Sequence, residues 1–222
     1  MERLGIIDIG SNTMRLVIVE IDAKGNYKII NELKKSARLS EGIGQDGNFS
    51  EDKVKEAYFA LKSFKNMCRS LNVREIFAVG TAAIRTAKNN QEILALAYDK
   101  LGIKINIIDG IQEANYAYLG VVQGIDVTNG LMIDIGGGSI ELVYIKDNKS
   151  CKMVSLPFGT FKIKEILGHQ SGNVIGDVEH LVSFLSSEFN KVEWLKTLKD
   201  VPIIGVGGII RSIAKVEKTS KK

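Results

Sequence analysis

The stretch Ile6–Thr13, IIDIGSNT, precedes the apolar run Leu16–Val19, LVIV, and it decides the fold because it occurs twice. It returns 126 positions later as Ile133–Ser139, IDIGGGS, which precedes the apolar run Leu142–Ile145, LVYI. A sequence pattern that occurs twice in the same chain indicates that one structural unit is repeated. The sequence therefore predicts two similar domains.

Each copy consists of a β-branched strand, a turn rich in Gly and Ser or Thr, and a second strand, which is the pattern of a hairpin. Glycine lets such a turn take positive φ and point its backbone N–H groups outward, where they bind phosphate oxygens. An Asp at the end of the first strand, Asp8 or Asp134, would lie beside the phosphate, where a divalent cation offsets the charge. For one copy alone an ordinary hairpin is the better explanation, but the pair favours a phosphate site.

Length and composition restrict the class of protein. A chain of 222 residues is long enough for one large or two medium domains with proper cores. Its content of 45% hydrophobic and 25% charged residues is ordinary for a globular protein. The longest apolar runs are strand-sized, so we expect neither a membrane span nor a secretory signal. The net charge of +4 suits an anionic ligand.

The cysteines and histidines predict no metal centre of their own. Cys68 and Cys151 lack metal-ligand spacing, and we expect both to be reduced and buried, as in a cytoplasmic protein. His169 and His180 are the two histidines and belong to no recognisable motif, which argues against a histidine-rich metal site.

The first half of the chain predicts an antiparallel meander followed by alternating helices and strands. Ser50 is the expected cap of the first helix, whose apolar stripe includes Val54, Leu61 and Phe64. We expect strands ending at Ile9 and over 15–21, 27–37, 75–79 and 105–108, and helices over 51–71, 90–101 and 112–124. This order is typical of the ribonuclease-H-like unit of actin-like phosphotransfer proteins.

The second half repeats this plan but stops early. We expect strands over 131–135, 140–146, 151–156 and 202–206, and helices over 161–167, 174–198 and 209–216. The predicted fold is α/β, with two ribonuclease-H-like domains whose mixed five-stranded sheets face each other across a cleft. The predicted domains are 1–124 and 125–222, and the second lacks a final strand and helix.

A third glycine-rich strand end, Gly205–Gly208, completes the set of phosphate loops expected in such a fold. The chain has no G-x-x-x-x-G-K-[ST] loop, and residues 205–210 break the G-x-G-x-x-G spacing. The three loops alone do not choose among kinases, chaperone ATPases and phosphohydrolases.

Four blocks of sequence resemble the exopolyphosphatase/guanosine pentaphosphatase (Ppx/GppA) family. They are Asp8–Leu16, Gly80–Asn89, Gly110–Ala114 with Leu119–Val121, and Asp134–Leu142. The resemblance runs in register over essentially the whole chain. It implies release of the terminal phosphate from inorganic polyphosphate, or of the 5′ terminal phosphate from guanosine pentaphosphate.

The resemblance also assigns roles to residues. Glu113 matches the family's catalytic glutamate, and a carboxylate there could orient and deprotonate the attacking water. Gln112 stands where a second glutamate is often found, so Glu113 is the sole carboxylate candidate in that helix. From helix position alone, Glu113 would be read as a solvated surface carboxylate.

We expect a magnesium ion held by Asp8, Asp134 and Glu141, directly or through water. Strand-end aspartates are otherwise commonly turn formers. Arg15 and Lys162 are weaker candidates for the anion-binding track, and Arg211, just after the third glycine loop, could reach a ligand phosphate. The predicted phosphate-binding residues are Gly10, Ser11, Asn12, Thr13, Arg85, Gly136, Gly137, Gly138, Ser139, Gly207 and Gly208.

Two other functions stay open at this point. The chain could bind polyphosphate or guanosine tetra- or pentaphosphate as a sensor with little turnover, because its second domain is incomplete. An actin-like sugar or acetate kinase fits less well, because those chains are longer and lack the Thr-Ala-Ala-x-Arg block. We expect no specific nucleic acid and no membrane as partner. A homodimer could cover the unfinished domain, and the chain could equally be a fragment.

Overall fold

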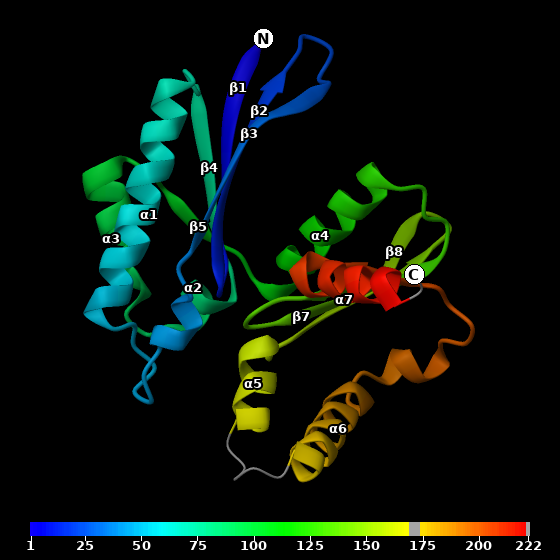
Figure 1. Ribbon diagram of the computed structural model, residues 1–222. Helices are drawn as coiled ribbons and strands as arrows, with labels where there is room; N and C mark the ends of the chain where they lie inside the picture. Colours follow the sequence, from blue (N-terminus) through cyan, green and yellow to red (C-terminus); the bar gives the residue numbers. More distant parts are fainter. Residues whose placement is uncertain (169–173, 221–222) are drawn as a thin grey trace. The chain divides into compact units, whose positions relative to one another are not determined.

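The first unit, Met1–Asp109, is organised around the first copy of the repeated hairpin. Its strands are β1 (Glu2–Ile9), β2 (Thr13–Ile21), β3 (Tyr27–Ser36), β4 (Glu75–Gly80) and β5 (Ile105–Ile107). They form a mixed sheet in the order β3-β2-β1-β4-β5, in which β1, β2 and β3 are antiparallel (Figure 1). β4 and β5 continue parallel to β1, so the predicted five-stranded sheet is confirmed.

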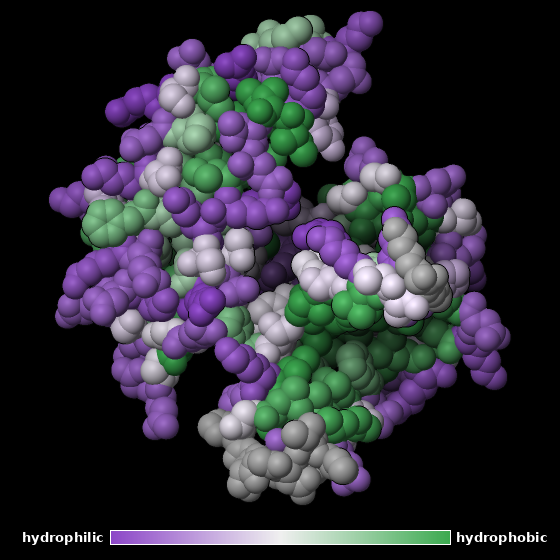
Figure 2. Space-filling model, viewed as in Figure 1, coloured by the Kyte–Doolittle hydropathy of each residue, from purple (hydrophilic) through white to green (hydrophobic). Residues whose placement is uncertain are grey.

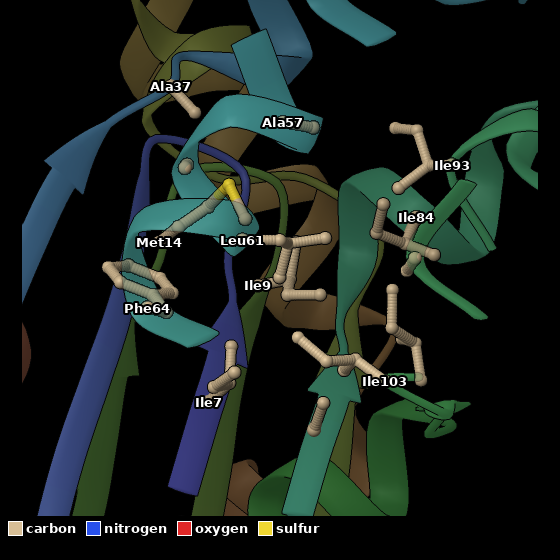
Figure 3. Packing of buried hydrophobic residues seen from close by; sticks show 14 of the residues in the cluster. Ile7, Ile9, Met14, Ala37, Ala57, Leu61, Phe64, Ile84, Ile93 and Ile103 are labelled. Carbon is tan, nitrogen blue, oxygen red and sulfur yellow. The ribbon is translucent and has the colours of Figure 1, made fainter. Parts of the chain in front are cut away.

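Helices cover one face of this sheet. They are η1 (Leu39–Gly42), α1 (Glu51–Ser70), α2 (Ala82–Thr86) and α3 (Asn90–Leu101). Ser50 caps α1 as predicted, and its hydroxyl accepts the Lys53 N–H at 3.4 Å. Apolar side chains of α1 meet those of the first hairpin, so Phe64 and Met14 are fully buried in one core (Figure 3).

The second unit, Gly110–Lys222, repeats the strand order of the first. Its strands are β6 (Gly130–Ile135), β7 (Ile140–Lys146), β8 (Lys149–Leu156) and β9 (Ile203–Val206), in the sheet order β8-β7-β6-β9. The β6–β7 and β7–β8 pairs are antiparallel, and β9 is parallel to β6. Two mixed sheets with this shared plan confirm the predicted α/β class, although the second has four strands within residues 1–168 and 174–220, which the structure describes.

One face of the second sheet is covered by the helix that the sequence places in the first domain. The helices of this unit are α4 (Gly110–Gly124), α5 (Thr160–Gly168), α6 (Val174–Asn190), η2 (Glu193–Thr197) and α7 (Gly207–Ser220). Ala114 and Tyr118 of α4 pack with Met132, Val143 and Ile145 of the sheet. The boundary between the compact units therefore lies before α4, after Asp109, whereas the sequence places it after Gly124.

The opposite face of the second sheet carries a separate apolar cluster. Leu142 and Leu156 are buried there, with Phe184 and Leu185 of α6 packed against them. Figure 2 shows apolar side chains of this unit reaching the surface between α6 and α7. This face is thus only partly covered by the described helices.

Two local expectations need correction. The helix predicted over 174–198 ends at Asn190, because Val192 turns into the core and the chain continues as the short helix η2. Residues 82–86, to which the sequence pattern assigns no element, form α2. Cys68 is buried as predicted, but Cys151 is exposed, because it lies near the start of the edge strand β8 beside the exposed Lys152.

His169 lies outside the described residues. None of the helices that the structure describes combines the length and apolar composition that a bilayer crossing requires.

Candidate functional site

The glycine turn of the first unit is closed by its own backbone. The Gly10 N–H donates to the Thr13 carbonyl at 3.2 Å, and a Cβ on Gly10 would lie 2.9 Å from that oxygen. The segment after β3 then caps the turn, because the N–H groups of residues 38 and 40 donate to the carbonyls of Asn12 and Ser11 at 2.9 and 3.1 Å. These bonds engage carbonyl oxygens of the turn.

The glycine turn of the second unit uses the same bonds. The Gly136 N–H donates to the Ser139 carbonyl at 3.0 Å, and a Cβ on Gly136 would lie 3.0 Å from that oxygen. The first N–H groups of α5, from Thr160 and Phe161, donate to the carbonyls of Gly136 and Gly137, each at 3.1 Å. The repeat seen in the sequence is therefore also a repeat of backbone bonding.

The reason for glycine in these turns differs from the predicted one. Neither Gly10 nor the residues 136–138 have positive φ; within the described part of the chain, Gly207 is the member of the three loops that does, at φ 90°. Gly10 and Gly136 are instead required by the close approach of a carbonyl oxygen. At Gly207 a Cβ would lie 2.7 Å from Oδ1 of Asp134, so the third loop lies directly against that carboxylate.

The strand register places polar side chains in a row across each sheet. In the second unit Asp134 lies opposite Glu141, which in turn lies opposite Ser155. The corresponding row of the first unit is Asp8, Arg15 and Lys34. The two copies of the repeat thus differ in charge, with a carboxylate in one at the position of a guanidinium in the other.

Glu141 is the most deeply buried carboxylate of the predicted site, with 2% of its surface exposed. Its Oε1 accepts a hydrogen bond from the Ser155 hydroxyl at 2.8 Å. Burial, and then the charge of Glu113, raise its pKa to about 7, while hydrogen bonds from Ser155 and Ser139 oppose the rise. The charge of Asp134 adds to the increase.

Glu113 lies in the first turn of α4 and is half-buried. Its negative charge contributes to the raised pKa of Glu141, so the two carboxylates are close enough to interact electrostatically. Burial also raises the pKa of Asp134, and the positive charge of Arg211 lowers it. The second unit thus brings together Glu113, Asp134 and Glu141 with Ser139 of the glycine turn.

The remaining predicted residues belong to the first unit. Asp8 is exposed, Ser11 is buried, and Thr13 begins β2. The guanidinium of Arg85, in α2, donates from Nη1 to the Ile108 carbonyl at 2.8 Å, which ties α2 to the end of β5. Arg85 therefore has a structural role beside its predicted role toward phosphate.

The weaker basic candidates have other partners or are exposed. Arg15 forms an ion pair with Glu32 at 3.0 Å, and Lys162 forms one with Glu165 at 3.0 Å. Arg211 is exposed on α7, and its charge acts on Asp134. Arg211 is therefore the one of these three whose electrostatic effect reaches the carboxylates.

Residues missed by the sequence reasoning include Ser155. It is recognisable only once β7 and β8 are paired, since the register sets it opposite Glu141. In the sequence alone, nothing else about a small polar residue near the end of a strand marks it as part of the site.

The predicted magnesium site agrees with the donor chemistry of Asp134 and Glu141. Among residues 1–168 and 174–220, no three His, Cys, Asp or Glu side chains are arranged around a common metal position. Mg²⁺ is commonly held by one or two carboxylates, with water and substrate phosphate completing its shell. Two oxygen donors opposite each other on paired strands fit that mode of binding, and Asp8 belongs to the other unit.

Comparison with protein families matches residues 17–222 to the Ppx/GppA phosphatase family. A guanosine-5'-triphosphate,3'-diphosphate pyrophosphatase of Pseudoalteromonas atlantica is 32% identical over 177 residues, which are 79% of this chain and 35% of the relative. The corresponding protein of Photobacterium profundum is 25% identical over 222 residues, 95% of this chain and 42% of the relative. The chain thus spans well under half the length of these relatives.

Solved structures give the same result for the fold. A Ppx/GppA family member of Aquifex aeolicus is similar with a TM-score of 0.78 and 33% identity, covering 97% of this chain and 69% of that one. An exopolyphosphatase of Cytophaga hutchinsonii is similar with a TM-score of 0.90 over 99% of this chain and 71% of that one. At 24% identity the second likeness concerns the fold alone.

Proposed function

The chain belongs to the Ppx/GppA phosphatase family, and on that premise we propose that it hydrolyses phosphoric anhydride bonds at the end of a polyanion. The proposed reaction releases terminal phosphate from inorganic polyphosphate, or the 5′ terminal phosphate from guanosine pentaphosphate. The name of one relative, a guanosine-5'-triphosphate,3'-diphosphate pyrophosphatase, supports the second substrate.

The observation that carries this proposal is the group of carboxylates in the second unit. Burial, and then the charge of Glu113, raise the pKa of Glu141, so the charge of Glu113 is felt at the buried carboxylate. Glu113 is the more accessible of the two, being half-buried on the first turn of α4. It is therefore the residue suited to accept a proton from water and to aim that water at phosphorus.

The glycine turn of the second unit would hold the phosphate. Carbonyl oxygens of the turns already accept bonds from the segments that follow β3 and β8. The groups that a turn can offer to an anion are its N–H groups and the hydroxyls of Ser or Thr. In the second unit this assigns phosphate binding to the N–H groups of Gly137, Gly138 and Ser139, because the Ser139 hydroxyl already bonds Glu141.

Asp134 and Glu141 would hold the magnesium ion. When bound, Mg²⁺ neutralises charge on the phosphate oxygens and on the two carboxylates. The raised pKa values of Asp134 and Glu141 support a cation at this place, because their negative charge is poorly solvated without one.

The test is an assay of phosphate release with and without Mg²⁺. Purified protein is given long-chain polyphosphate or guanosine pentaphosphate, and free phosphate is followed in time. Mg²⁺-dependent release from either supports the proposal, and the ratio of kcat/KM values identifies the preferred substrate. Tight binding of polyphosphate without any release would instead favour a sensor, and phosphate transferred to an added sugar or acetate would favour a kinase.

A further inference from the structure

Ser155 lies on β8 and contacts both Glu141 and the start of α4. It lies opposite Glu141 in the register of β7 and β8, and its hydroxyl donates to Glu141 Oε1 at 2.8 Å. Because Glu141 is 2% exposed, solvent cannot replace this bond without opening the packing. Ser155 therefore helps to orient the Glu141 carboxylate, together with Ser139.

Ser155 also touches the helix that carries Glu113. Gly110 is the first residue of α4, and a Cβ on Gly110 would lie 2.4 Å from Cβ of Ser155 and 2.6 Å from its Oγ. The start of α4 thus rests directly on this side chain. Any larger residue at position 155 would displace the turn of helix that contains Glu113.

Both contacts involve the same face of the second sheet. Further along it, Ala114 and Tyr118 of α4 pack on Val143 and Ile145, and the Tyr118 hydroxyl donates to the Asn148 carbonyl at 2.9 Å. Apolar packing and the Tyr118 hydrogen bond therefore hold the far half of α4. Its first turn is placed by the contact between Gly110 and Ser155.

We propose that Ser155 is a positioning residue, which orients the Glu141 carboxylate through its hydroxyl and sets the approach of Glu113 through its small size. This inference rests on the proposed hydrolase function for its catalytic meaning. The residue needed at 155 is then both a hydrogen-bond donor and small, which serine satisfies and alanine or valine does not.

The first test compares Ser155→Ala with Ser150→Ala on the same strand, where Ser150 lies opposite Ile145. Phosphate release is measured over a range of Mg²⁺ concentrations. We expect Ser155→Ala to raise the Mg²⁺ concentration for half-maximal rate by about tenfold or more, since partners of ligating carboxylates typically contribute that much.

This readout separates positioning from a general loss of folded protein. A fraction of unfolded enzyme lowers the maximal rate but leaves the half-saturating Mg²⁺ concentration unchanged. If Ser155→Ala and Ser150→Ala require the same Mg²⁺ concentration as the unaltered protein, the inference is overturned.

The second test does not depend on activity. Free energies of unfolding are measured at pH 8 with EDTA for the unaltered protein, Ser155→Ala, Glu141→Ala and the double variant. We expect the effect of Ser155→Ala to shrink to less than half when Glu141 is absent, because the two side chains bond each other. Additive effects would contradict the inference, whereas absence of phosphate release by the unaltered protein would contradict only the proposed function.

Discussion

At the scale of single residues, the sequence identifies Glu141 but not its environment. The motif predicts an acidic magnesium ligand, whereas burial and the pairing with Ser155 emerge only in the folded sheet. The same holds for Gly10 and Gly136. Sequence reasoning explains these glycines by positive φ, whereas in the structure each is required by a carbonyl oxygen close by.

Glu141 makes stability depend on pH in the metal-free protein. Its pKa rises from 4.5 to about 7, so between these values the folded state binds a proton that the unfolded state has lost. The contribution of Glu141 to the free energy of unfolding therefore decreases as pH rises through this window, by about 3 kcal/mol at most. Denaturant unfolding at several pH values in EDTA should show a smaller decrease for Glu141→Gln, and equal slopes for both proteins would refute this assignment.

At the scale of elements, α4 both packs on the second sheet and carries Glu113. Apolar periodicity predicts that a helix exists over 112–124, but it does not tell which sheet the helix covers. The order of elements along the chain assigns this helix to the first domain. In the structure Ala114 and Tyr118 pack on the second sheet, so the helix belongs to the second unit. For α6 the pattern extends the helix too far, since the burial of Val192 is a tertiary effect.

Two glycines of α4 offer a matched comparison. A Cβ on Gly110 would clash with Ser155, whereas a Cβ on Gly120 has no heavy atom within 4 Å. We expect Gly110→Ala to lower the free energy of unfolding by about 1–3 kcal/mol through overpacking. Gly120→Ala should raise it by about 0.5–1 kcal/mol, because alanine favours the helix. Chemical denaturation of both variants checks the pair, and a stabilised Gly110→Ala protein would show that α4 does not rest on Ser155.

At the scale of the whole molecule, each unit has its own core. The first core joins α1 to the first hairpin and includes Phe64, which is fully buried, while Phe59 on the same helix is 62% exposed (Figure 3). The spacing of apolar residues predicts the inward face of α1 because that helix packs along its entire length on one sheet. The repeat itself, Asp8 and Asp134 included, predicts the common strand plan of both units.

The two phenylalanines test this core directly. Phe64→Ala should cost about 3–5 kcal/mol of stability, because it leaves a cavity beneath the sheet. Phe59→Ala should cost well under 1 kcal/mol, as is usual for exposed positions. Thermal or denaturant unfolding measures both, and similar losses for the two variants would contradict the assigned core.

The central claim for the molecule is that Glu113 activates the water that releases phosphate. The most direct measurement is the rate of Mg²⁺-dependent phosphate release from polyphosphate by Glu113→Gln, with Glu179→Gln, an exposed helix glutamate of the same unit, as control. Loss of the general base predicts a rate about 10²–10⁴ times lower at undiminished polyphosphate binding, with the control unchanged. A Glu113→Gln protein that releases phosphate as fast as the control would contradict the claim.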